Sequence, residues 1–296
     1  MLKLICPHKD IFDSTILLKY KKYFKCTFLN ISQKKFDKIS NNYDIILTRF
    51  THYINFNNKN RIKYILSPTT GLTHIDQKFF ENSKVKVFNL KNKNFLRTIR
   101  ASSEFTIFLI LTTLRKIKNV NQPYLIGSEI NNKLVGVVGL GRIGNSVAKF
   151  CFSQGADIIY FDKKELKNKK YKKTNLKYLL KKSDIIVICI PSSVDNFNFI
   201  SRDKLKLLKK DAVIINTARG EIIDENYIVK LAKKKFVYYS TDVIQNEQYT
   251  KKRKFKKLNK IKNVIATGHI AGLTKESIYK TDKEIFTKFI GYYEKN

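Results

Sequence analysis

Three residues in the last third of the chain have side chains that can move a proton beside a bound carboxylate: Arg219, Glu247 and His269. His269 stands in the segment NVIATGHIAG (263–272), whose small residues leave its imidazole open to a ligand. A carboxylate such as Glu247 beside an imidazole favours its charged form and fixes its tautomer. Arg219 can hold a carboxylate with two parallel hydrogen bonds. The set suits hydride transfer on a hydroxy acid, where the hydroxyl proton must leave with the hydride, although His269 alone would also fit an ordinary loop.

A glycine-rich segment follows a strand pattern and opens a helix pattern. Its glycines are Gly139, Gly141 and Gly144, and the next strand pattern ends in Asp162. In this context the first glycine permits a tight turn, the second lets the backbone approach a pyrophosphate, and the third lets helix and strand pack closely. The carboxylate accepts hydrogen bonds from ribose hydroxyls and repels a 2′-phosphate, which predicts NAD rather than NADP as the cofactor. The alternative is a glycine turn that binds nothing.

Strand patterns must position these side chains. From Lys133 onward the strands are predicted at 133–138, 157–161, 184–190, 212–216, 236–241 and 263–267. Arg219 follows the fourth of them, Asp242 and Glu247 follow the fifth, and His269 follows the last. Ligands collect at the carboxyl ends of strands in open α/β sheets, so we expect all these residues at one edge, with Asp242 and Glu247 exposed there.

The first ninety residues form another α/β series. Its strands are predicted at 2–7, 24–29, 43–48, 62–67 and 84–90, and its helices at 10–23 and 73–82. A long apolar run over 97–118 predicts one helix that packs between domains or subunits, and 275–295 predicts a final amphipathic helix. The alternation indicates parallel sheets, and a chain of 296 residues favours two domains, with a cleft between them.

The formal net charge of +35 would by itself suggest nucleic acid or an anionic surface. The lysines are spread over nearly every segment, however, together with many Asn, Ile, Tyr and Phe residues, as an AT-rich genome would encode. The basic runs at 163–173 and 250–262 lack the regular aromatic residues of a single-strand binder. We therefore expect no specific nucleic-acid partner, although nucleic-acid binding driven by the charge stays an alternative.

The remaining features indicate a cytoplasmic protein. No signal peptide is visible, and the longest apolar stretch, 105–114, has about half the length of a bilayer crossing. The four cysteines are widely spaced without a C-x-x-C pair, which predicts free thiols, a reducing compartment and no metal site. We expect structural roles for His8, His52 and His74, with His74 at the start of a helix.

Over nearly its whole length the chain resembles the D-isomer-specific 2-hydroxyacid dehydrogenase family, which includes D-3-phosphoglycerate dehydrogenase and hydroxypyruvate/glyoxylate reductases. The order and spacing of several segments carry the resemblance: SPTTGLTHID (67–76), IRASSEFTIFLILTTLRKI (99–117), GVVGLGRIG (136–144), SDIIVICIP (183–191), INTARGEIIDE (215–225), TDVIQNE (241–247) and HIAGLTKES (269–277). The early segments favour the branch similar to phosphoglycerate dehydrogenase.

The resemblance implies a Rossmann-type NAD-binding domain over 97–274 and a smaller flavodoxin-like α/β substrate domain over 1–96 plus 275–296. It implies a homodimer formed through the 97–118 helix. His269 would be the acid/base with Glu247 as its partner, and Arg219 would clamp the carboxylate and 2-oxo oxygen of a small 2-hydroxy or 2-oxo acid. Other positions would bind the substrate carboxylate through backbone amides (Thr70, Gly71) or the cofactor (Gly139, Gly141, Arg142, Ile143, Gly144, Asp162, Pro191, Thr217, Asp242 and Gly272).

Three positions depart from the family pattern. Gln248 and Gly268 replace prolines that usually flank the catalytic pair, and Phe105 replaces a common histidine. The lost prolines predict looser loops around His269 and Glu247. The expected function is an NAD-dependent 2-hydroxyacid dehydrogenase, and the alternative is an NAD-sensing binding protein with little turnover on the same fold.

Overall fold

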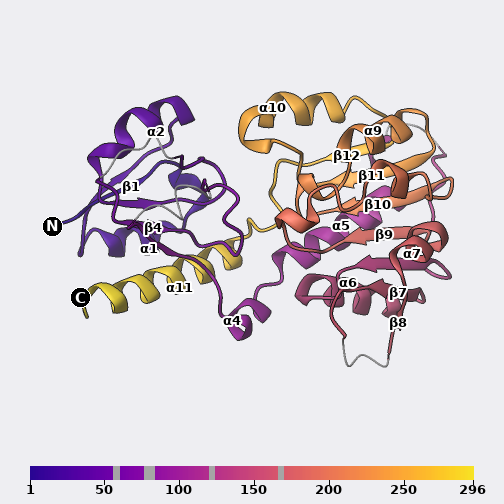
Figure 1. The fold of residues 1–296 in the computed structure, drawn as a ribbon, viewed down its shortest axis with the longest axis horizontal. Helices are drawn as coiled ribbons and strands as arrows, with labels where there is room; N and C mark the ends of the chain where they lie inside the picture. Colours follow the sequence, from indigo (N-terminus) through magenta and orange to yellow (C-terminus); the bar gives the residue numbers. More distant parts are fainter. Residues whose placement is uncertain (56–60, 77–83, 120–123, 166–169) are drawn as a thin grey trace. The chain divides into compact units, whose positions relative to one another are not determined.

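The chain folds into two compact units, shown in the computed structural model of Figure 1. The first unit consists of Met1–Ile99 and Leu273–Asn296, and the second of Arg100–Gly272. The boundaries predicted from the sequence follow residues 96 and 274, close to these. The structure describes residues 1–55, 61–76, 84–119, 124–165 and 170–296.

The first unit contains a five-stranded parallel sheet with the order β2-β1-β3-β4-β5. Its strands are β1 (Lys3–Cys6), β2 (Lys25–Phe28), β3 (Ile45–Leu47), β4 (Tyr64–Leu66) and β5 (Lys86–Phe88). The apolar runs of β1 and β3 are buried on both faces, as expected of central parallel strands. All five predicted strands are confirmed, and their order is the flavodoxin-like one.

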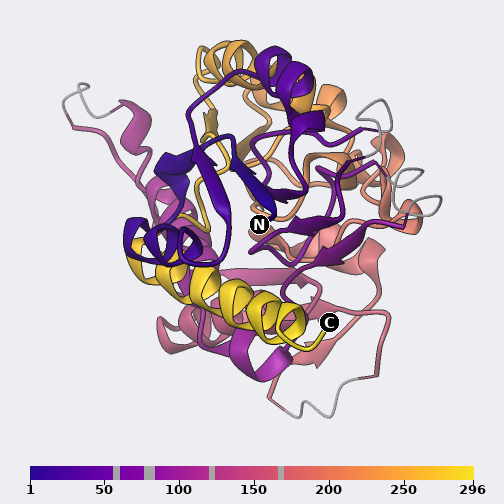
Figure 2. The same cartoon turned by 90° about the vertical axis from the view of Figure 1, so that its left-hand side faces the viewer.

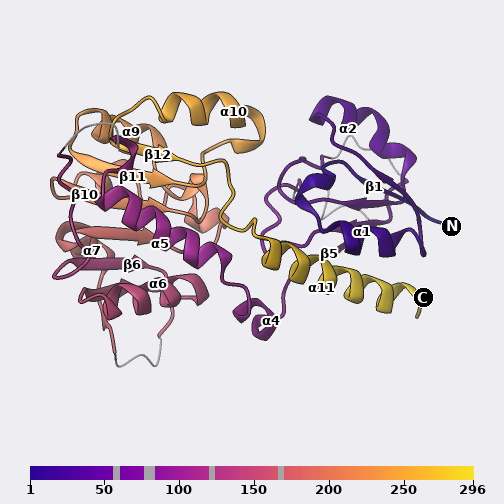
Figure 3. The same cartoon turned by 180° about the vertical axis from the view of Figure 1, so that it is seen from behind.

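Helices cover both faces of this sheet: α1 (Ser14–Tyr20), α2 (Gln33–Ile39), α4 (Lys93–Arg97) and α11 (Lys275–Tyr293), with short 3₁₀ turns η1 (Lys9–Ile11) and η2 (Ser40–Asn42). Phe36 of α2 packs on the face that carries Ile5, while Phe289 of α11 packs on the face that carries Leu4. Figure 2 shows the strands between α2 and the C-terminal helix, and Figure 3 shows α11 beside α1 and β5. The last helix of the chain therefore completes the core begun by the first strand.

The second unit contains a seven-stranded parallel sheet with the order β12-β11-β10-β9-β6-β7-β8. Its strands are β6 (Leu134–Val138), β7 (Asp157–Phe161), β8 (Lys172–Lys173), β9 (Ile185–Ile188), β10 (Ala212–Asn216), β11 (Val237–Thr241) and β12 (Val264–Ala266). The strand order reverses between β6 and β9, and such a switch point is where doubly wound sheets bind ligands. The six predicted strands are confirmed, whereas β8 was missed because two lysines carry no apolar pattern.

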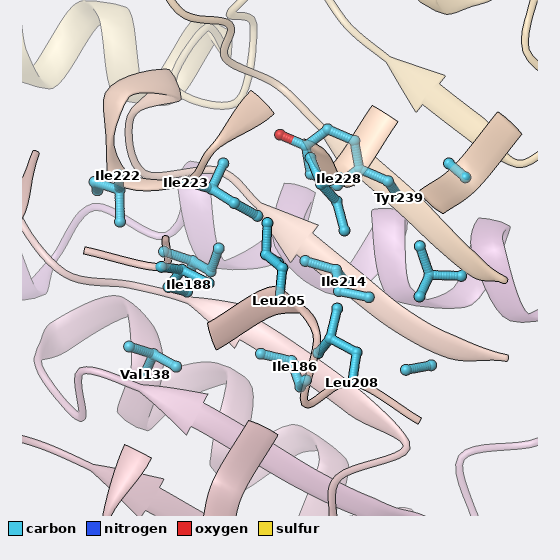
Figure 4. Close-up of a cluster of buried hydrophobic side chains, with 14 of the residues drawn as sticks. Val138, Ile186, Ile188, Leu205, Leu208, Ile214, Ile222, Ile223, Ile228 and Tyr239 are labelled. Atoms are coloured by element: carbon cyan, nitrogen blue, oxygen red, sulfur yellow. The ribbon is translucent and has the colours of Figure 1, made fainter. Parts of the chain in front are cut away.

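Helices also flank the second sheet: α5 (Ala101–Leu114), α6 (Arg142–Ser153), α7 (Leu176–Lys182), α8 (Arg202–Leu205), α9 (Glu225–Lys233) and α10 (Glu247–Leu258), with 3₁₀ turns η3 (Ile117–Asn119), η4 (Val194–Asn196) and η5 (Gly220–Ile222). Alternate strand residues face opposite layers. Ile186 and Ile214 pack with Leu205 and Ile228 in the cluster of Figure 4, while Val187 packs with α5 and α6 on the other face. No helix in the described part of the chain is both long and apolar enough to cross a membrane.

The single helix predicted over 97–118 was wrong, and so was the placement of His74 at a helix start. The run over 97–118 is not one helix, because α4 ends at Arg97 and α5 begins at Ala101. The break coincides with the boundary between the two units, since Ile99 ends the first segment of one unit and Arg100 begins the other. Of the helix predicted over 73–82, residues 77–83 lie outside the described residues, and His74 itself lies buried in a turn with Nε2 3.1 Å from Ser67 Oγ.

All four cysteines are free, as predicted. Cys6 and Cys151 are buried, and Cys26 and Cys189 are half-buried. Burial raises the pKa of the Cys6, Cys151 and Cys189 thiols to about 12. These thiols are therefore neutral at physiological pH and are poor nucleophiles.

Candidate active site

The carboxyl ends of five strands in the second unit are in register. Val138 pairs with Ile188, Ile188 with Asn216, Asn216 with Thr241, and Thr241 with Ala266. The segments that follow these strand ends therefore leave the sheet at one edge. They are 139–144, 189–191, 217–219, 242–247 and 267–272, and they hold nearly every site residue that the sequence predicts in this unit.

The glycine-rich loop has the geometry of a phosphate cradle. Gly139 lies at φ 94°, in the left-handed region that favours glycine, and a Cβ on Gly144 would lie 2.1 Å from the Gly139 carbonyl oxygen. Around the Cβ position of Gly141, by contrast, no described atom lies within 4 Å. Gly141 is the N-cap of α6 and supplies no side chain to cap the first amides of that helix. The residues present therefore fit a dinucleotide pyrophosphate at this helix terminus.

Asp162 braces the same loop from the end of β7. Its Oδ2 accepts a hydrogen bond from the Leu140 amide at 2.9 Å, and Oδ1 accepts one from the Lys164 amide at 2.9 Å. Arg142 and Ile143, the first residues of α6, are half-buried beside the loop, and burial together with the charge of Arg100 lowers the pKa of Arg142. The carboxylate predicted for the ribose thus lies at the Gly-rich turn.

His269 and Glu247 form a direct pair. His269 Nδ1 lies 2.9 Å from Glu247 Oε2, and the two side chains are only 17% and 16% exposed. Glu247 begins α10 after Asn246, which lies at φ 55°, and His269 itself lies at φ 60°. The adjacent Gly268 is exposed, and no described atom lies within 4 Å of its Cβ position. Loop geometry on both partners therefore sets the contact between imidazole and carboxylate.

Asp242 is fully buried, which corrects the expectation that the end of β11 exposes it. Its Oδ1 accepts hydrogen bonds from Thr267 Oγ1 at 2.6 Å and from the Ile270 amide at 2.9 Å, and Oδ2 accepts one from the Ala271 amide at 2.8 Å. Burial raises the pKa of this carboxyl, and the Thr267 hydrogen bond, the His269 charge and the two amides oppose the rise. Asp242 thus holds both sides of the loop that carries His269.

Arg219 leaves β10 in a turn that Asn216 organises. Asn216 Oδ1 accepts from the Ala218 amide at 3.1 Å, and its Nδ2 donates to the Arg219 carbonyl at 2.9 Å. Arg219 Nη1 donates to the Ala218 carbonyl at 2.7 Å, while its buried Nε donates to no acceptor within the described residues. Burial lowers the pKa of Arg219, and the charges of Glu247 and Glu221 oppose that fall.

Gly220 brings the arginine turn against the segment that leads to Glu247. A Cβ on Gly220 would lie 2.0 Å from the Ile244 carbonyl carbon and 2.3 Å from the Gln245 nitrogen. The Gln245 amide in turn donates to Glu225 Oε2 at 2.7 Å, and the Asn246 amide donates to Glu221 Oε1 at 3.2 Å. Close backbone approach therefore fixes the separation of Arg219 and Glu247.

The remaining predicted positions of this unit lie beside the same strand ends. Thr217 Oγ1 lies 2.7 Å from Thr106 Oγ1 of α5, and the Cβ position of Gly272 lies 4.0 Å from Ser102 Oγ of that helix. Pro191 is exposed after β9, and its carbonyl accepts a hydrogen bond from Asn196 Nδ2 at 2.8 Å. Of the positions expected to bind the nicotinamide, Thr217 and Gly272 therefore lie beside α5, and Pro191 lies just after β9.

Thr70 and Gly71 lie in the first unit, in the loop after β4. Ser67 Oγ and Thr69 Oγ1 are 2.8 Å apart, and Thr69 Oγ1 donates to the Gly71 carbonyl at 2.8 Å. The Thr69 carbonyl also accepts from the Leu90 amide at 3.0 Å. Hydroxyl groups therefore stiffen this loop, in which Thr70 is exposed and its carbonyl accepts a hydrogen bond from Asn89 Nδ2 at 3.3 Å.

Sequence reasoning missed Asn216 and Gly220. Asn216 was detectable as the one polar residue of the buried strand AVIIN, at the position where the chain must turn toward Arg219. Gly220 had no such signal, because its need for glycine arises from the Ile244 backbone of another strand connection.

Comparison with known proteins gives a consistent result. The family model described as the D-isomer specific 2-hydroxyacid dehydrogenase, NAD binding domain, matches residues 107–271. A glyoxylate reductase from Thermofilum pendens is 32% identical over 237 residues, which cover 73% of this chain and 67% of that protein.

Solved structures share the fold over nearly the whole chain. A D-lactate dehydrogenase from Aquifex aeolicus, complexed with NAD and lactic acid, matches with a TM-score of 0.82 at 21% identity. The matched region covers 99% of this chain and 95% of the dehydrogenase chain. An acyclic imino acid reductase in complex with NADPH and D-Arg has a TM-score of 0.81 at 24% identity and covers 99% of this chain and 98% of its own.

Proposed function

The chain belongs to the D-isomer-specific 2-hydroxyacid dehydrogenase family, and from this premise we propose that it interconverts a small D-2-hydroxy acid and its 2-oxo acid through His269, Glu247 and Arg219. It is an NAD-dependent 2-hydroxyacid dehydrogenase. The substrate that we propose is of the glyoxylate, hydroxypyruvate or 3-phosphoglycerate type. The observation that carries the assignment of roles is the pair of His269 Nδ1 and Glu247 Oε2, 2.9 Å apart at the sheet edge that also bears Arg219.

His269 is the acid/base in this proposal. Because the Glu247 carboxylate can only accept, His269 Nδ1 keeps its proton and Nε2 is the atom that exchanges one. The imidazolium gives its Nε2 proton to the carbonyl oxygen during reduction, and the neutral ring takes the hydroxyl proton on Nε2 during oxidation. The carboxylate stabilises the imidazolium form that precedes reduction and fixes the ring plane. Asp242 holds the loop on both sides of His269 through its hydrogen bonds from Thr267, Ile270 and Ala271.

Arg219 binds the substrate carboxylate and 2-oxo oxygen in this proposal. Its Nε is buried without a described acceptor, which suits a guanidinium whose partner is a ligand anion. Burial strengthens this interaction since less water screens it. For the first unit taken by itself, we propose the backbone amides of Thr70 and Gly71 as donors to a substrate carboxylate.

NAD accepts or supplies the hydride when it is bound. Gly139, Gly141 and Gly144, with Arg142 and Ile143, would hold the pyrophosphate at the start of α6. Asp162 would accept hydrogen bonds from the ribose hydroxyls, and its charge disfavours the 2′-phosphate of NADP. The nicotinamide end would lie among Pro191, Thr217, Asp242 and Gly272, where the buried Asp242 acts chiefly through the loop that it holds.

A substrate panel tests the proposed function. NADH consumption is measured with glyoxylate, hydroxypyruvate, pyruvate and phosphohydroxypyruvate for the wild type and for Arg219→Lys. At least one 2-oxo acid should be reduced, and Arg219→Lys should mainly raise KM, because an ammonium cannot reproduce the bidentate fork. Glu129→Gln, an exposed change elsewhere in the second unit, is the control. Tight NADH binding without oxidation of NADH by any of these acids would instead favour an NAD-sensing protein.

We also propose that the protein is a homodimer that buries the outer face of α5. On that helix Phe108 is 51% exposed and Leu111 is 39% exposed, and Ile126 in the following segment is 81% exposed. Large exposed apolar side chains close together on one helix, such as Phe108 and Leu111, are typical of a protein–protein interface. A second copy of the chain is the partner that the family resemblance implies.

A further inference from the structure

A buried guanidinium joins distant segments of the first unit. Arg49 follows β3 and is 4% exposed. Its Nη2 lies 2.5 Å from Asp282 Oδ1 and 2.9 Å from Thr281 Oγ1, both on α11. Asp282 Oδ2 also accepts a hydrogen bond from the Asp13 amide at 2.7 Å, so the N-cap of α1 holds the partner of Arg49 as well.

The other nitrogens of Arg49 reach the opposite side. Nη1 donates to the Pro68 carbonyl at 3.0 Å, and Nε donates to the Ile11 carbonyl at 3.1 Å. A guanidinium is planar and rigid, so these four hydrogen bonds fix the Pro68 carbonyl relative to α11 and to the η1 turn. Charge-assisted hydrogen bonds in a buried site are also the strong ones. The position of Pro68 is thereby determined by residues on four separate segments.

Pro68 leads directly into the loop with Thr70 and Gly71. The Thr69 hydroxyl contacts Ser67 on one side and the Gly71 carbonyl on the other, both at 2.8 Å, so residues 67–71 form one stiff unit. A displacement of the Pro68 carbonyl would therefore shift the amides of Thr70 and Gly71. Arg49 itself is occupied by protein acceptors and acts only through this loop.

We propose that Arg49 is a positioning residue for 2-oxo acid reduction, which holds the 67–71 loop where the Thr70 and Gly71 amides bind the substrate carboxylate. The inference rests on the proposed function. The C-terminal helix α11 thereby affects substrate binding indirectly. Its residues Thr281 and Asp282 fix the Arg49 guanidinium, and the guanidinium fixes the Pro68 carbonyl at the start of the loop.

Arg49→Lys tests the inference. A lysine keeps a positive charge for Asp282, but its single nitrogen cannot also reach the Pro68 and Ile11 carbonyls. We expect KM for the 2-oxo acid to rise roughly 10- to 100-fold, while kcat at saturation and the Kd for NADH stay unchanged. Hydrogen exchange in a peptide covering 67–72 should be faster. Thr281→Val, which removes one acceptor and leaves the ion pair, should shift KM in the same direction.

Phe289→Leu is the matched control. It weakens the packing of α11 in the core without touching the Arg49 contacts, so it should lower Tm and leave both KM and exchange in 67–72 unchanged. The inference is overturned if Arg49→Lys and Thr281→Val behave like Phe289→Leu. A wild-type protein that reduces no 2-oxo acid would instead remove the proposed function, and the positioning role with it.

Discussion

Replacing Glu247 by glutamine removes one charge from the catalytic pair and little else. The amide is nearly isosteric with the carboxylate, so the hydrogen bond to His269 Nδ1 can persist. At the 2.9 Å separation of His269 Nδ1 and Glu247 Oε2, opposite unit charges attract by ~6 kcal/mol for an effective dielectric constant of about 20, and by ~1.4 kcal/mol in bulk water. The side chains are about one-sixth exposed, which places the pair between these limits.

A value of roughly 3 kcal/mol within this range corresponds to a loss of about 10²-fold in the rate of proton transfer, since each 1.36 kcal/mol is tenfold. We therefore expect Glu247→Gln to lower kcat about 100-fold while the Kd for NADH stays constant. Single-turnover oxidation of bound NADH after mixing with the preferred 2-oxo acid measures the step directly, and NADH fluorescence measures cofactor binding. His269→Ala should lose about 10²- to 10⁴-fold in the same assay.

Glu129→Gln controls for the loss of one negative charge from this strongly basic protein. If Glu247→Gln retained more than a third of wild-type kcat while His269→Ala was inactive, the carboxylate would not support the imidazolium and its assigned role would be wrong. If both variants were fully active, the proton carrier would have to be sought elsewhere.

Other expectations follow from single contacts. Gly268→Ala should raise the free energy of unfolding by about 0.4–1 kcal/mol, because its Cβ position is open and its φ is not in the left-handed region. Gly220→Ala should lower the free energy of unfolding by about 1–3 kcal/mol, because the new Cβ would clash with the Ile244 backbone. Chemical denaturation of both variants would show whether the two effects differ in sign. Asp282 has its pKa raised by burial from 3.8 to about 6, so its folded form binds a proton more tightly and this contribution to stability is lost as pH rises from about 4 to 6. The unfolding free energy of the wild type minus that of Asp282→Asn should accordingly fall by about 2–3 kcal/mol over that window, and a flat difference would contradict the assignment. Phe108→Glu should give monomers in light scattering, whereas Leu18→Glu, at a site 58% exposed on α1, should not; a Phe108→Glu dimer would exclude the α5 face.

Most of the fold could be predicted because its determinants are local. Runs such as IIVI in β9 and AVIIN in β10 are buried on both faces, and only a central parallel strand accommodates them. The glycine spacing of 139–144 predicted this turn because Gly139 adopts a positive φ and Gly144 approaches the Gly139 carbonyl closely, and both requirements are local. The helix break at residues 98–100 could not be predicted, because neither proline nor glycine stands in the stretch RTIRASSE (97–104) to mark it.

The parts of the site that the sequence did not reveal depend on contacts between distant residues. Asp242 was expected at the surface because a strand end that carries a carboxylate is usually solvated, but three donors from residues 267–271 satisfy it in the interior. Arg49 and Asp282 are 233 residues apart, and no periodicity links them. The proximity of His269 and Glu247, in contrast, followed from the rule that neighbouring parallel strands end at one edge.

The φ angle of 60° at His269 has a consequence for engineering. Apart from glycine, the residues found most often in this left-handed conformation are asparagine, aspartate and histidine. The histidine therefore suits both the backbone of the loop and the proton transfer proposed for it. In a library of replacements at residue 269, asparagine and aspartate should keep the loop conformation, whereas β-branched residues should add a backbone cost of order 1–3 kcal/mol. Either kind of replacement should remove the proton carrier, so loss of activity and loss of stability can be separated at this one position.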